Sequence, residues 1–178
     1  MDTLQYVEAQ RTMHIDEFRP TKAQSLLLEV LGAIGRCPGN LHLSSAVFIL
    51  QELRAIPALY EFRFQPPSEN TPFSAEFHKD LSTLLSHGLV FDSGTSHSLF
   101  LTEQGEATVG AGTIPPKLAT LFTTNPNAAV ELSKLRFHFE IVKEVSPDSS
   151  QDELETYVPM PRARLEIAVR AYRDLFGQ

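Results

Sequence analysis

The side chains that could perform chemistry in this chain begin with its single cysteine. Cys37 would need a neighbouring base to act as a nucleophile, because the thiolate rather than the thiol attacks. The nearest histidine along the chain is His42, five residues further on, and no acidic residue stands beside it to orient the imidazole. We therefore interpret Cys37 as an unreactive thiol, either in a loop or half-buried. A single cysteine also excludes an internal disulfide.

The six histidines do not form a recognisable metal site. They lack the H-x-x-x-H and H-x-H spacings that bring two imidazoles to one side of an element. The acidic stretch at residues 144–155 lacks the alternating ligands and the glycine of a calcium loop, so we interpret it as an exposed acidic linker. The sequence also contains no phosphate-binding glycine motif and no nucleophile elbow. It therefore predicts no catalytic residues, no metal, no cofactor and no enzymatic activity.

Basic side chains gather on the last predicted helix, at residues 161–176. Arg162, Arg170 and Arg173 lie on one face of this helix, next to an apolar face. The apolar face repeats at steps of three and four residues, and its members are Leu165, Ala168, Val169, Tyr172, Leu175 and Phe176. Such a helix either packs on its own domain or pairs with a copy of itself. The three arginines form an alternative nucleic-acid-binding face.

The central stretch of the chain, residues 71–105, has the pattern of a helix followed by a hairpin. Apolar residues at helical spacing are Phe73, Phe77, Leu81, Leu84 and Leu85. Ser74 is the expected N-cap of this helix, and Gly88 supplies the left-handed residue that ends it. Two short apolar strands follow, at 89–91 and 98–101, joined by a polar turn. This is the order of a recognition helix and a wing.

Two further helices are predicted before the central stretch. Thr21 and Gln24 match the capping box, in which each side chain binds the other residue's backbone amide, so a helix is expected over residues 21–34. A second helix is expected over residues 45–55, with Ser44 as its N-cap. Both helices belong to the predicted core.

An aromatic strand and a loop are expected to connect the second helix to the central one. Tyr60, Phe62 and Phe64 alternate with Glu61 and Arg63, which is the period of a half-buried strand. Residues 65–71 contain two prolines and are predicted to form a loop.

The chain divides into three predicted parts. Residues 1–20 form an N-terminal arm, which could be swapped between two copies in a dimer. Its expected anchors on the core are Tyr6, Met13, Ile15 and Phe18. Residues 21–114 form the core, which ends before two consecutive prolines. Residues 115–178 form a C-terminal helical extension, with helices expected at 117–122, 126–145 and 161–176. Asn125 is expected to cap the second of these helices.

The core resembles known winged-helix families. One set of residues is similar to the signature that ends the winged-helix domains of MarR and PadR regulators: Leu84, Leu85, Gly88, Leu89, Val90, Leu99, Leu101, Thr102 and Gly105. A second set resembles small prokaryotic proteins similar to YwgA and, more distantly, SocA/Panacea-type antitoxins: Gly35, Arg36, Thr71, Pro72, Phe73 and Ser74. The resemblance implies an α+β, mostly helical fold, a winged helix-turn-helix core with a small antiparallel sheet.

Composition and charge restrict the function. The chain has 178 residues, of which 42% are hydrophobic and 21% charged, which is typical of a globular protein. No apolar run approaches the roughly 20 residues that span a bilayer, so no membrane association is expected, and a cytoplasmic location is the default. The formal net charge is −7. Residues 21–110 carry five basic and nine acidic side chains, a net charge of −4, so the core is itself acidic.

These observations favour a protein-interaction or regulatory module over a DNA-binding regulator. A recognition helix needs basic or amide side chains on its exposed face, and the predicted turn at 92–98 has neither arginine nor lysine. The primary hypothesis is an accessory subunit of a prokaryotic complex, of the toxin-antitoxin or defence kind. DNA binding and a homodimer through the last helix or the arm stay open as alternatives. The residues predicted to bind a protein partner are Glu76, Lys79, Asp80, Thr83 and His97.

Overall fold

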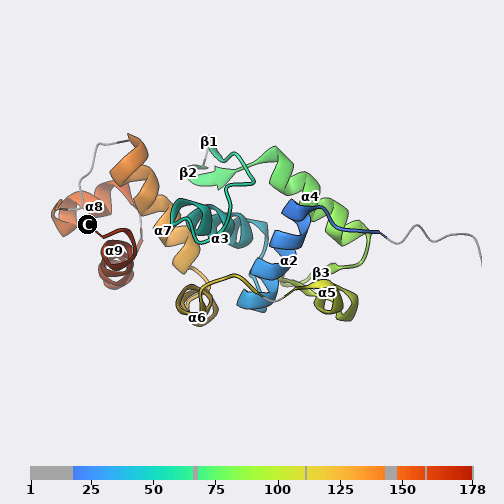
Figure 1. Cartoon of the computed structure of the whole chain (residues 1–178). Coiled ribbons are helices and arrows are strands. Elements are labelled where there is room, and N and C mark those ends of the chain that lie inside the picture. The colour runs from blue at the N-terminus through green and yellow to red at the C-terminus, as the bar shows by residue number, and fades with distance from the viewer. Residues whose placement is uncertain (1–17, 66–67, 111, 143–147, 159, 178) are drawn as a thin grey trace, which may run out of the picture.

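The computed structural model describes residues 18–65, 68–110, 112–142, 148–158 and 160–177. In this part of the chain the fold is mostly helical, with two antiparallel sheets of two strands each. The predicted α+β class is therefore confirmed. The molecule is elongated, with α8 and α9 at one end and α4, β3 and α5 at the other (Figure 1). None of the described helices is both long and apolar enough to cross a membrane.

The bounds of the elements follow. The first part contains α2 (Lys22–Ile34), α3 (Asn40–Glu52), β1 (Arg63–Gln65), β2 (Ser68–Phe73), α4 (Ala75–Ser86), β3 (Val90–Asp92), β4 (Leu99–Leu101) and α5 (Glu103–Thr108). The second part contains α6 (Pro116–Thr124), α7 (Ala128–Arg136), the π-helix η1 (Phe137–Val142), α8 (Gln151–Tyr157) and α9 (Arg162–Phe176). One hydrophobic core is continuous through both parts, and α7 packs between α3 and α9.

The predicted caps of α2 and α4 are confirmed. At α2 the Thr21 hydroxyl accepts from the Gln24 amide at 3.2 Å, and the Gln24 side chain accepts from the Thr21 amide at 3.0 Å. At α4 the Ser74 hydroxyl accepts from the amide of Phe77 at 3.4 Å. These side chains satisfy backbone donors that have no partner within the helix. Local signals in the sequence were sufficient to place both helix starts.

The predicted start of the second helix was wrong. Helix α3 begins at Asn40, and Ser44 lies inside it, buried and bonded through its hydroxyl to the Leu41 carbonyl at 3.1 Å. The residue before the helix is Gly39, whose φ of 101° is strained for any residue with a Cβ. The helix therefore starts directly after a glycine turn, without a side-chain cap.

The predicted loop at 65–71 was also wrong, because most of it forms β2, which pairs antiparallel with β1. The regular strand β1 begins only at Arg63, although burial alternates from Tyr60 onward as expected. Tyr60 and Phe62 belong to an aromatic cluster with Phe48 and Phe77, with ring centroids 5.7 to 6.3 Å apart. Phe73, predicted to face inward from the central helix, ends β2 and is 38% exposed.

The second hairpin, β3 with β4, follows the prediction closely. Val90 pairs with Leu101, Phe91 with Phe100 and Asp92 with Leu99. An isolated bridge between Cys37 and Leu99 adds a third chain segment on the other side of β4. Gly88, after α4, has a φ of 69°, as expected for the residue that ends the helix. The hairpin is therefore joined to α4 through Gly88 and, by the bridge at Cys37, to the segment that follows α2.

The C-terminal helices depart from the prediction in two places. The helix expected at 126–145 begins at Ala128, without a side-chain cap, and changes to the π-helix η1 after Arg136. Asn125 instead accepts a hydrogen bond from the amide of Asn127, at 3.2 Å. The expected acidic linker is partly helical, because α8 occupies 151–157 with a capping box between Ser150 and Glu153. Its remaining residues at 144–147 lie outside the described part of the chain.

The N-terminal arm is described only from Phe18 onward. The expected anchors Tyr6, Met13 and Ile15 lie outside the described residues. Phe18 is half-buried and stacks on His87 of the α4 terminus, with ring centroids 3.9 Å apart. This contact confirms Phe18 as an anchor on the core.

Candidate functional site

The residues predicted to bind a partner do not all face solvent. Glu76 and Lys79 are exposed on α4, and His97 is exposed at the tip of the β3–β4 turn with a φ of 47°. Thr83 is half-buried, and its hydroxyl donates to the Lys79 carbonyl at 2.9 Å. Asp80 points inward instead. The structure therefore leaves Glu76 and Lys79 as the exposed charged pair from this set on α4.

Asp80 serves the core rather than the surface. Its two carboxylate oxygens accept hydrogen bonds from the Gln24 amide group at 2.9 Å and from the Tyr60 hydroxyl at 3.0 Å. Both donors are buried, at 6% and 5% exposure. Burial, together with the hydrogen bond and charge of Asp80, raises the pKa of Tyr60 well above its usual range. Asp80 thus connects α2, α4 and the segment before β1.

Replacing Asp80 with alanine is expected to lower the free energy of unfolding by about 2 kcal/mol, because two buried donors lose their acceptor. Urea denaturation followed by circular dichroism measures the change. The matched control is Lys79→Ala, an exposed residue on the same helix, which should stay within about 0.5 kcal/mol of the wild type. Equal effects of the two substitutions would show that the Asp80 hydrogen bonds do not contribute to stability.

The exposed face of the hairpin carries an aromatic pair that the sequence did not single out. Phe91 is 49% exposed, and Phe100 lies opposite it on β4 with its ring centroid 5.1 Å away. Their neighbours Val90 and Leu99 are buried, so the two phenylalanines occupy the outer side of the sheet. The alternation of residues in both strands indicated which side chains point outward. Only the register of the two strands shows that the two rings meet.

An apolar groove lies next to this pair. It has a volume of about 450 Å³ and runs between the end of α2, strand β4 and helix α5. Its lining residues are Leu31, Gly32, Gly35, Phe100, Leu101, Glu106 and Val109. Phe100 therefore belongs both to the aromatic pair and to the groove, which makes the two features one continuous apolar surface. We call this surface the hairpin surface.

One carboxylate, that of Glu106, lines the groove of the hairpin surface. Asp92 on β3 and Glu103 and Glu106 on α5 are exposed. Arg36 is exposed as well, but its guanidinium donates to the Ser96 hydroxyl at the turn, at 3.1 Å. The turn itself is held by serine hydroxyls, with Ser93 and Ser96 2.6 Å apart. A molecule that docks here meets apolar side chains and the Glu106 carboxylate.

Cys37 is buried beneath the hairpin and is not a nucleophile in this structure. It is 2% exposed, and its thiol lies 3.6 Å from the Gly39 carbonyl. Burial raises the pKa of the thiol from 9.0 to about 12, partly opposed by the contact with Gly39. His42 does not approach it as a base; the His42 imidazole instead lies 3.0 Å from the Asn127 side chain.

Iodoacetamide is expected to alkylate Cys37 much more slowly in the native protein than in urea, as mass spectrometry can follow. The raised pKa also affects stability. The Cys37 thiol keeps its proton to a higher pH in the folded state than in the unfolded state. Its contribution to the free energy of unfolding is therefore complete below pH 9 and is lost as the pH rises toward 12. We therefore expect the free energy of unfolding to fall above pH 9, and to fall less in Cys37→Ala. Rapid alkylation of the folded protein would contradict the burial of the thiol.

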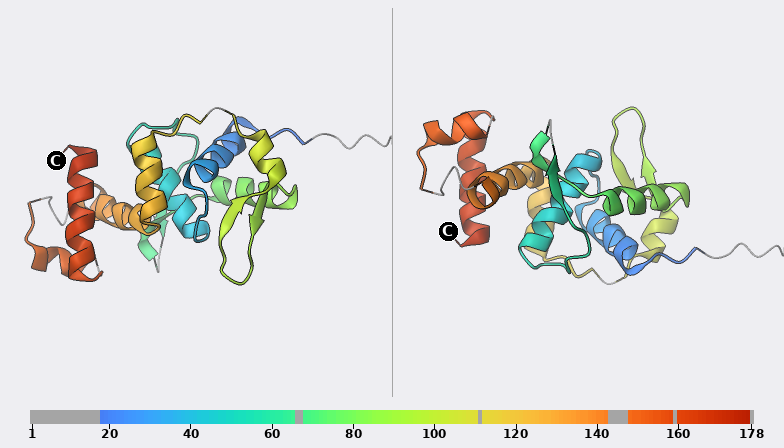
Figure 2. Two further views of the ribbon diagram at one scale, coloured as in Figure 1. Left: turned by 90° about the horizontal axis from the view of Figure 1, so that it is seen from below. Right: turned by 90° about the horizontal axis from the view of Figure 1, so that it is seen from above.

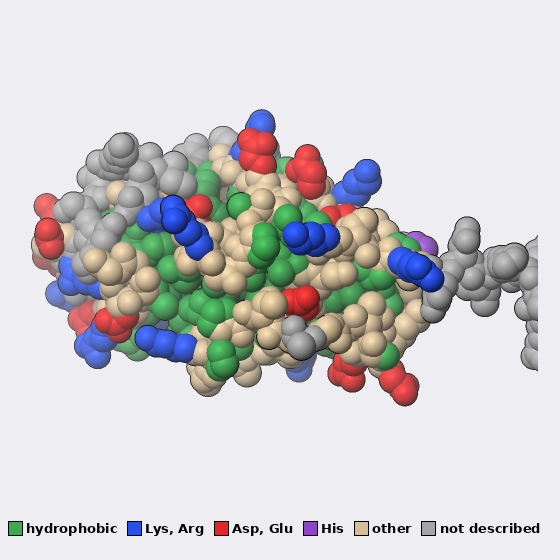
Figure 3. All heavy atoms as spheres, viewed as in Figure 1, with side chains coloured by type: hydrophobic (Ala, Val, Ile, Leu, Met, Phe, Trp, Pro, Cys, Tyr) green, Lys and Arg blue, Asp and Glu red, His purple; other side chains and the backbone are tan. Residues whose placement is uncertain are grey.

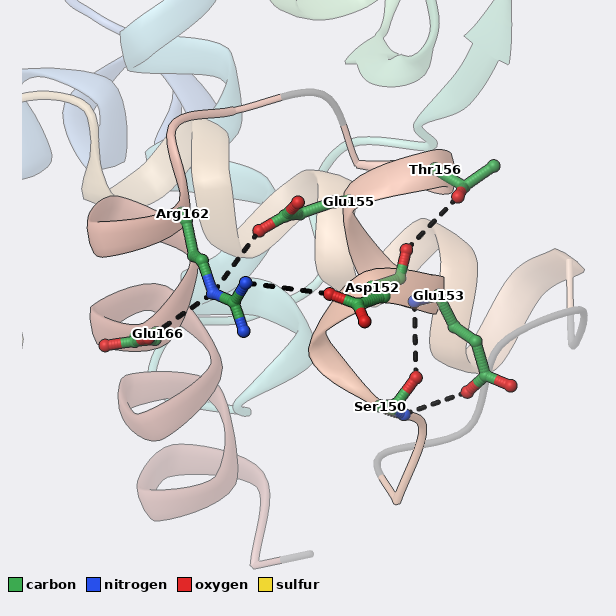
Figure 4. A network of polar contacts seen from close by, with 7 residues as sticks. All are labelled: Ser150, Asp152, Glu153, Glu155, Thr156, Arg162 and Glu166. Atoms are coloured by element: carbon green, nitrogen blue, oxygen red, sulfur yellow. Dashed lines mark hydrogen bonds and ion pairs between the residues drawn. The ribbon is translucent and has the colours of Figure 1, made fainter.

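The alternative nucleic-acid face on α9 is offset by acidic neighbours. The Arg162 guanidinium lies 3.6 Å from Asp152, 3.7 Å from Glu155 and 4.0 Å from Glu166 (Figure 4). Arg170 and Arg173 line a pocket together with Glu166 and Asp174. The three arginines therefore do not form an unopposed positive surface, which a phosphate backbone would require.

The described residues contain no group of three or more histidine, cysteine or carboxylate side chains that could hold a metal ion. Comparison of the chain with protein-family models, curated proteins and solved structures finds no match. Function must therefore be inferred from the fold and its surfaces. These define a mostly helical α+β protein with an exposed apolar surface on one hairpin.

Proposed function

We propose that this chain is a non-enzymatic protein-interaction module built on a winged-helix core, serving as an accessory subunit of a prokaryotic complex in the cytoplasm. The order α2, α3, β1–β2, α4 and β3–β4 supports the winged-helix assignment. In it, α4 takes the place of the recognition helix and the β3–β4 hairpin that of the wing. The bridge from Cys37 to Leu99 adds the short third strand typical of such cores.

The observation that carries the interaction role is the hairpin surface. Exposed aromatic pairs beside an apolar groove are the anchors around which protein interfaces form, because burying an aromatic ring contributes strongly to binding. The Glu106 carboxylate, which lines the groove, favours a partner with lysine or arginine next to its apolar contact residues. The partner site therefore centres on Phe91 and Phe100, with Glu76 and Lys79 of α4 as the second, more polar candidate.

DNA binding through α4 is the alternative, and its electrostatics are unfavourable. Glu76 and Lys79 largely cancel each other, and the turn at 92–98 brings no lysine or arginine to a phosphate. The guanidinium of the nearby Arg36 already donates a hydrogen bond to the Ser96 hydroxyl.

The test is recovery of the tagged protein from native cell extract, with and without nuclease, followed by mass spectrometry. The proposal predicts one stoichiometric protein partner that survives nuclease treatment. Recovery of DNA alone, lost on nuclease treatment and at raised salt, would instead establish the DNA-binding alternative.

A further inference from the structure

Helix α9 has an apolar stripe that the described part of the chain leaves partly exposed. Leu165, Ala168 and Tyr172 are buried against the rest of the molecule, whereas Ile167 is 62% exposed. Ala171 and Leu175 follow Ile167 at steps of four residues and are half-buried. Residues four apart lie on one face of a helix, so the three form a continuous stripe with its smallest member in the middle. Ile167 is the most exposed of the large hydrophobic residues that the structure describes.

A groove runs along this stripe. Helices α6 and α9 have nearly parallel axes on either side of α7 (Figure 2). Between them lies a groove of about 270 Å³, walled by Leu118 and Leu121 of α6 and by Ala171 and Leu175 of α9. Hydrophobic side chains reach the surface in this area of the molecule (Figure 3). The face therefore presents a protruding isoleucine and a groove one to two helical turns away.

The protruding Ile167 and the groove occupy positions on α9 that a two-fold axis would bring together. If two α9 helices pair antiparallel around Ala171, Ile167 of each copy lies across from Leu175 of the other, because both residues are one turn from Ala171. Ile167 would then enter the groove of the opposite copy. An alanine at the centre permits close approach of the two helices.

The charges beside the stripe complement each other under the same symmetry. Arg170 and Asp174 are exposed on one edge of α9. In an antiparallel two-fold pair, this edge of one helix lies beside the same edge of the other. Along the helix axis, Arg170 of one copy and Asp174 of the other then differ by two residues, roughly 3 Å. Two symmetry-related ion pairs then border the apolar contact. We propose that a second copy of this chain covers the α6–α9 face, through α9 pairing antiparallel with itself.

This contact is at the end of the molecule opposite the β3–β4 hairpin and does not depend on the proposed partner function (Figure 1). Analytical ultracentrifugation tests it directly. The wild type is expected at twice the chain mass of 19.8 kDa. Ile167→Lys should weaken dimerisation by about a hundredfold, because two buried isoleucines are lost per dimer. Leu41→Lys, at a comparably exposed apolar residue on α3, is the matched control and should stay dimeric.

A charge exchange tests the register. Arg170→Asp places two aspartates on each edge, and Asp174→Arg places two arginines, so each variant alone should dimerise about tenfold more weakly than the wild type. An equal mixture of the two variants should restore the affinity, because every edge contact is then between opposite charges. Pairing within one helix cannot produce this rescue. A monomeric wild type, a fully dimeric Ile167→Lys, or a mixture no tighter than its parts would each overturn the proposal.

Discussion

Replacing Gly105 with alanine is expected to lower the free energy of unfolding by roughly 3 kcal/mol or more, because the added methyl group overpacks a tight backbone contact. A Cβ at this position would overlap the Leu89 carbonyl oxygen. That oxygen cannot easily move, since it accepts from the Thr102 amide at 3.1 Å. The Gly105 amide is itself bonded to the Thr102 hydroxyl at 3.0 Å, which fixes the start of α5.

Urea denaturation of Gly105→Ala and of a matched control, Gly110→Ala, measures this effect. A Cβ at Gly110 would have no neighbour within 4 Å, and the φ of Gly110 is not positive. The Gly110→Ala variant should therefore be about as stable as the wild type. Alanine is better than glycine in a helix by at most about 1 kcal/mol, which is too little to offset the overlap in α5. Equal stability of both variants would show that α5 does not pack this closely on Leu89.

The second large effect is expected on partner binding. Phe91→Lys should weaken the affinity for the protein partner by at least about thirtyfold, the loss typical of an aromatic anchor at the centre of an interface. The added positive charge also opposes a basic partner that approaches Glu106. The fold should be unaffected, because Phe91 is 49% exposed. Isothermal titration calorimetry with the recovered partner measures the change.

Two controls locate the site in the same titration. Leu41→Lys replaces an apolar residue of similar exposure, 43%, on α3, which is not among the lining residues of the hairpin surface, and should bind like the wild type. Glu76→Lys reverses a charge on α4 and should have the smaller effect if the hairpin surface is the main contact. A large loss in Glu76→Lys with none in Phe91→Lys would move the site to α4.

Local sequence signals predicted the parts of the fold that depend on neighbouring residues. The capping box at Thr21, the cap at Ser74 and the left-handed Gly88 are all found where the sequence placed them. The start of α3 was missed because Gly39, rather than a capping side chain, precedes it. Strand β2 was missed because Pro66 and Pro67 suggested a loop, whereas the chain forms a strand from Ser68 onward that pairs with β1.

The candidate surface depended on contacts that a sequence pattern cannot supply. Helical periodicity left Asp80 on the outside of α4, but its partners Gln24 and Tyr60 lie 56 and 20 residues away in the chain. Phe91 and Phe100 were expected in strands, yet their meeting depends on the register of the hairpin. The groove beside them joins α2, β4 and α5, which come together only in the folded chain.

The most direct test of the hairpin surface is site-specific photo-cross-linking in cells. A photoreactive phenylalanine analogue replaces Phe91 in one variant and Leu41 in a control variant of similar exposure. The proposed function predicts a single protein adduct from position 91, insensitive to nuclease, and no such adduct from position 41. Adducts to nucleic acid from position 91, or the same protein adduct from both positions, would contradict a protein-binding site on this hairpin.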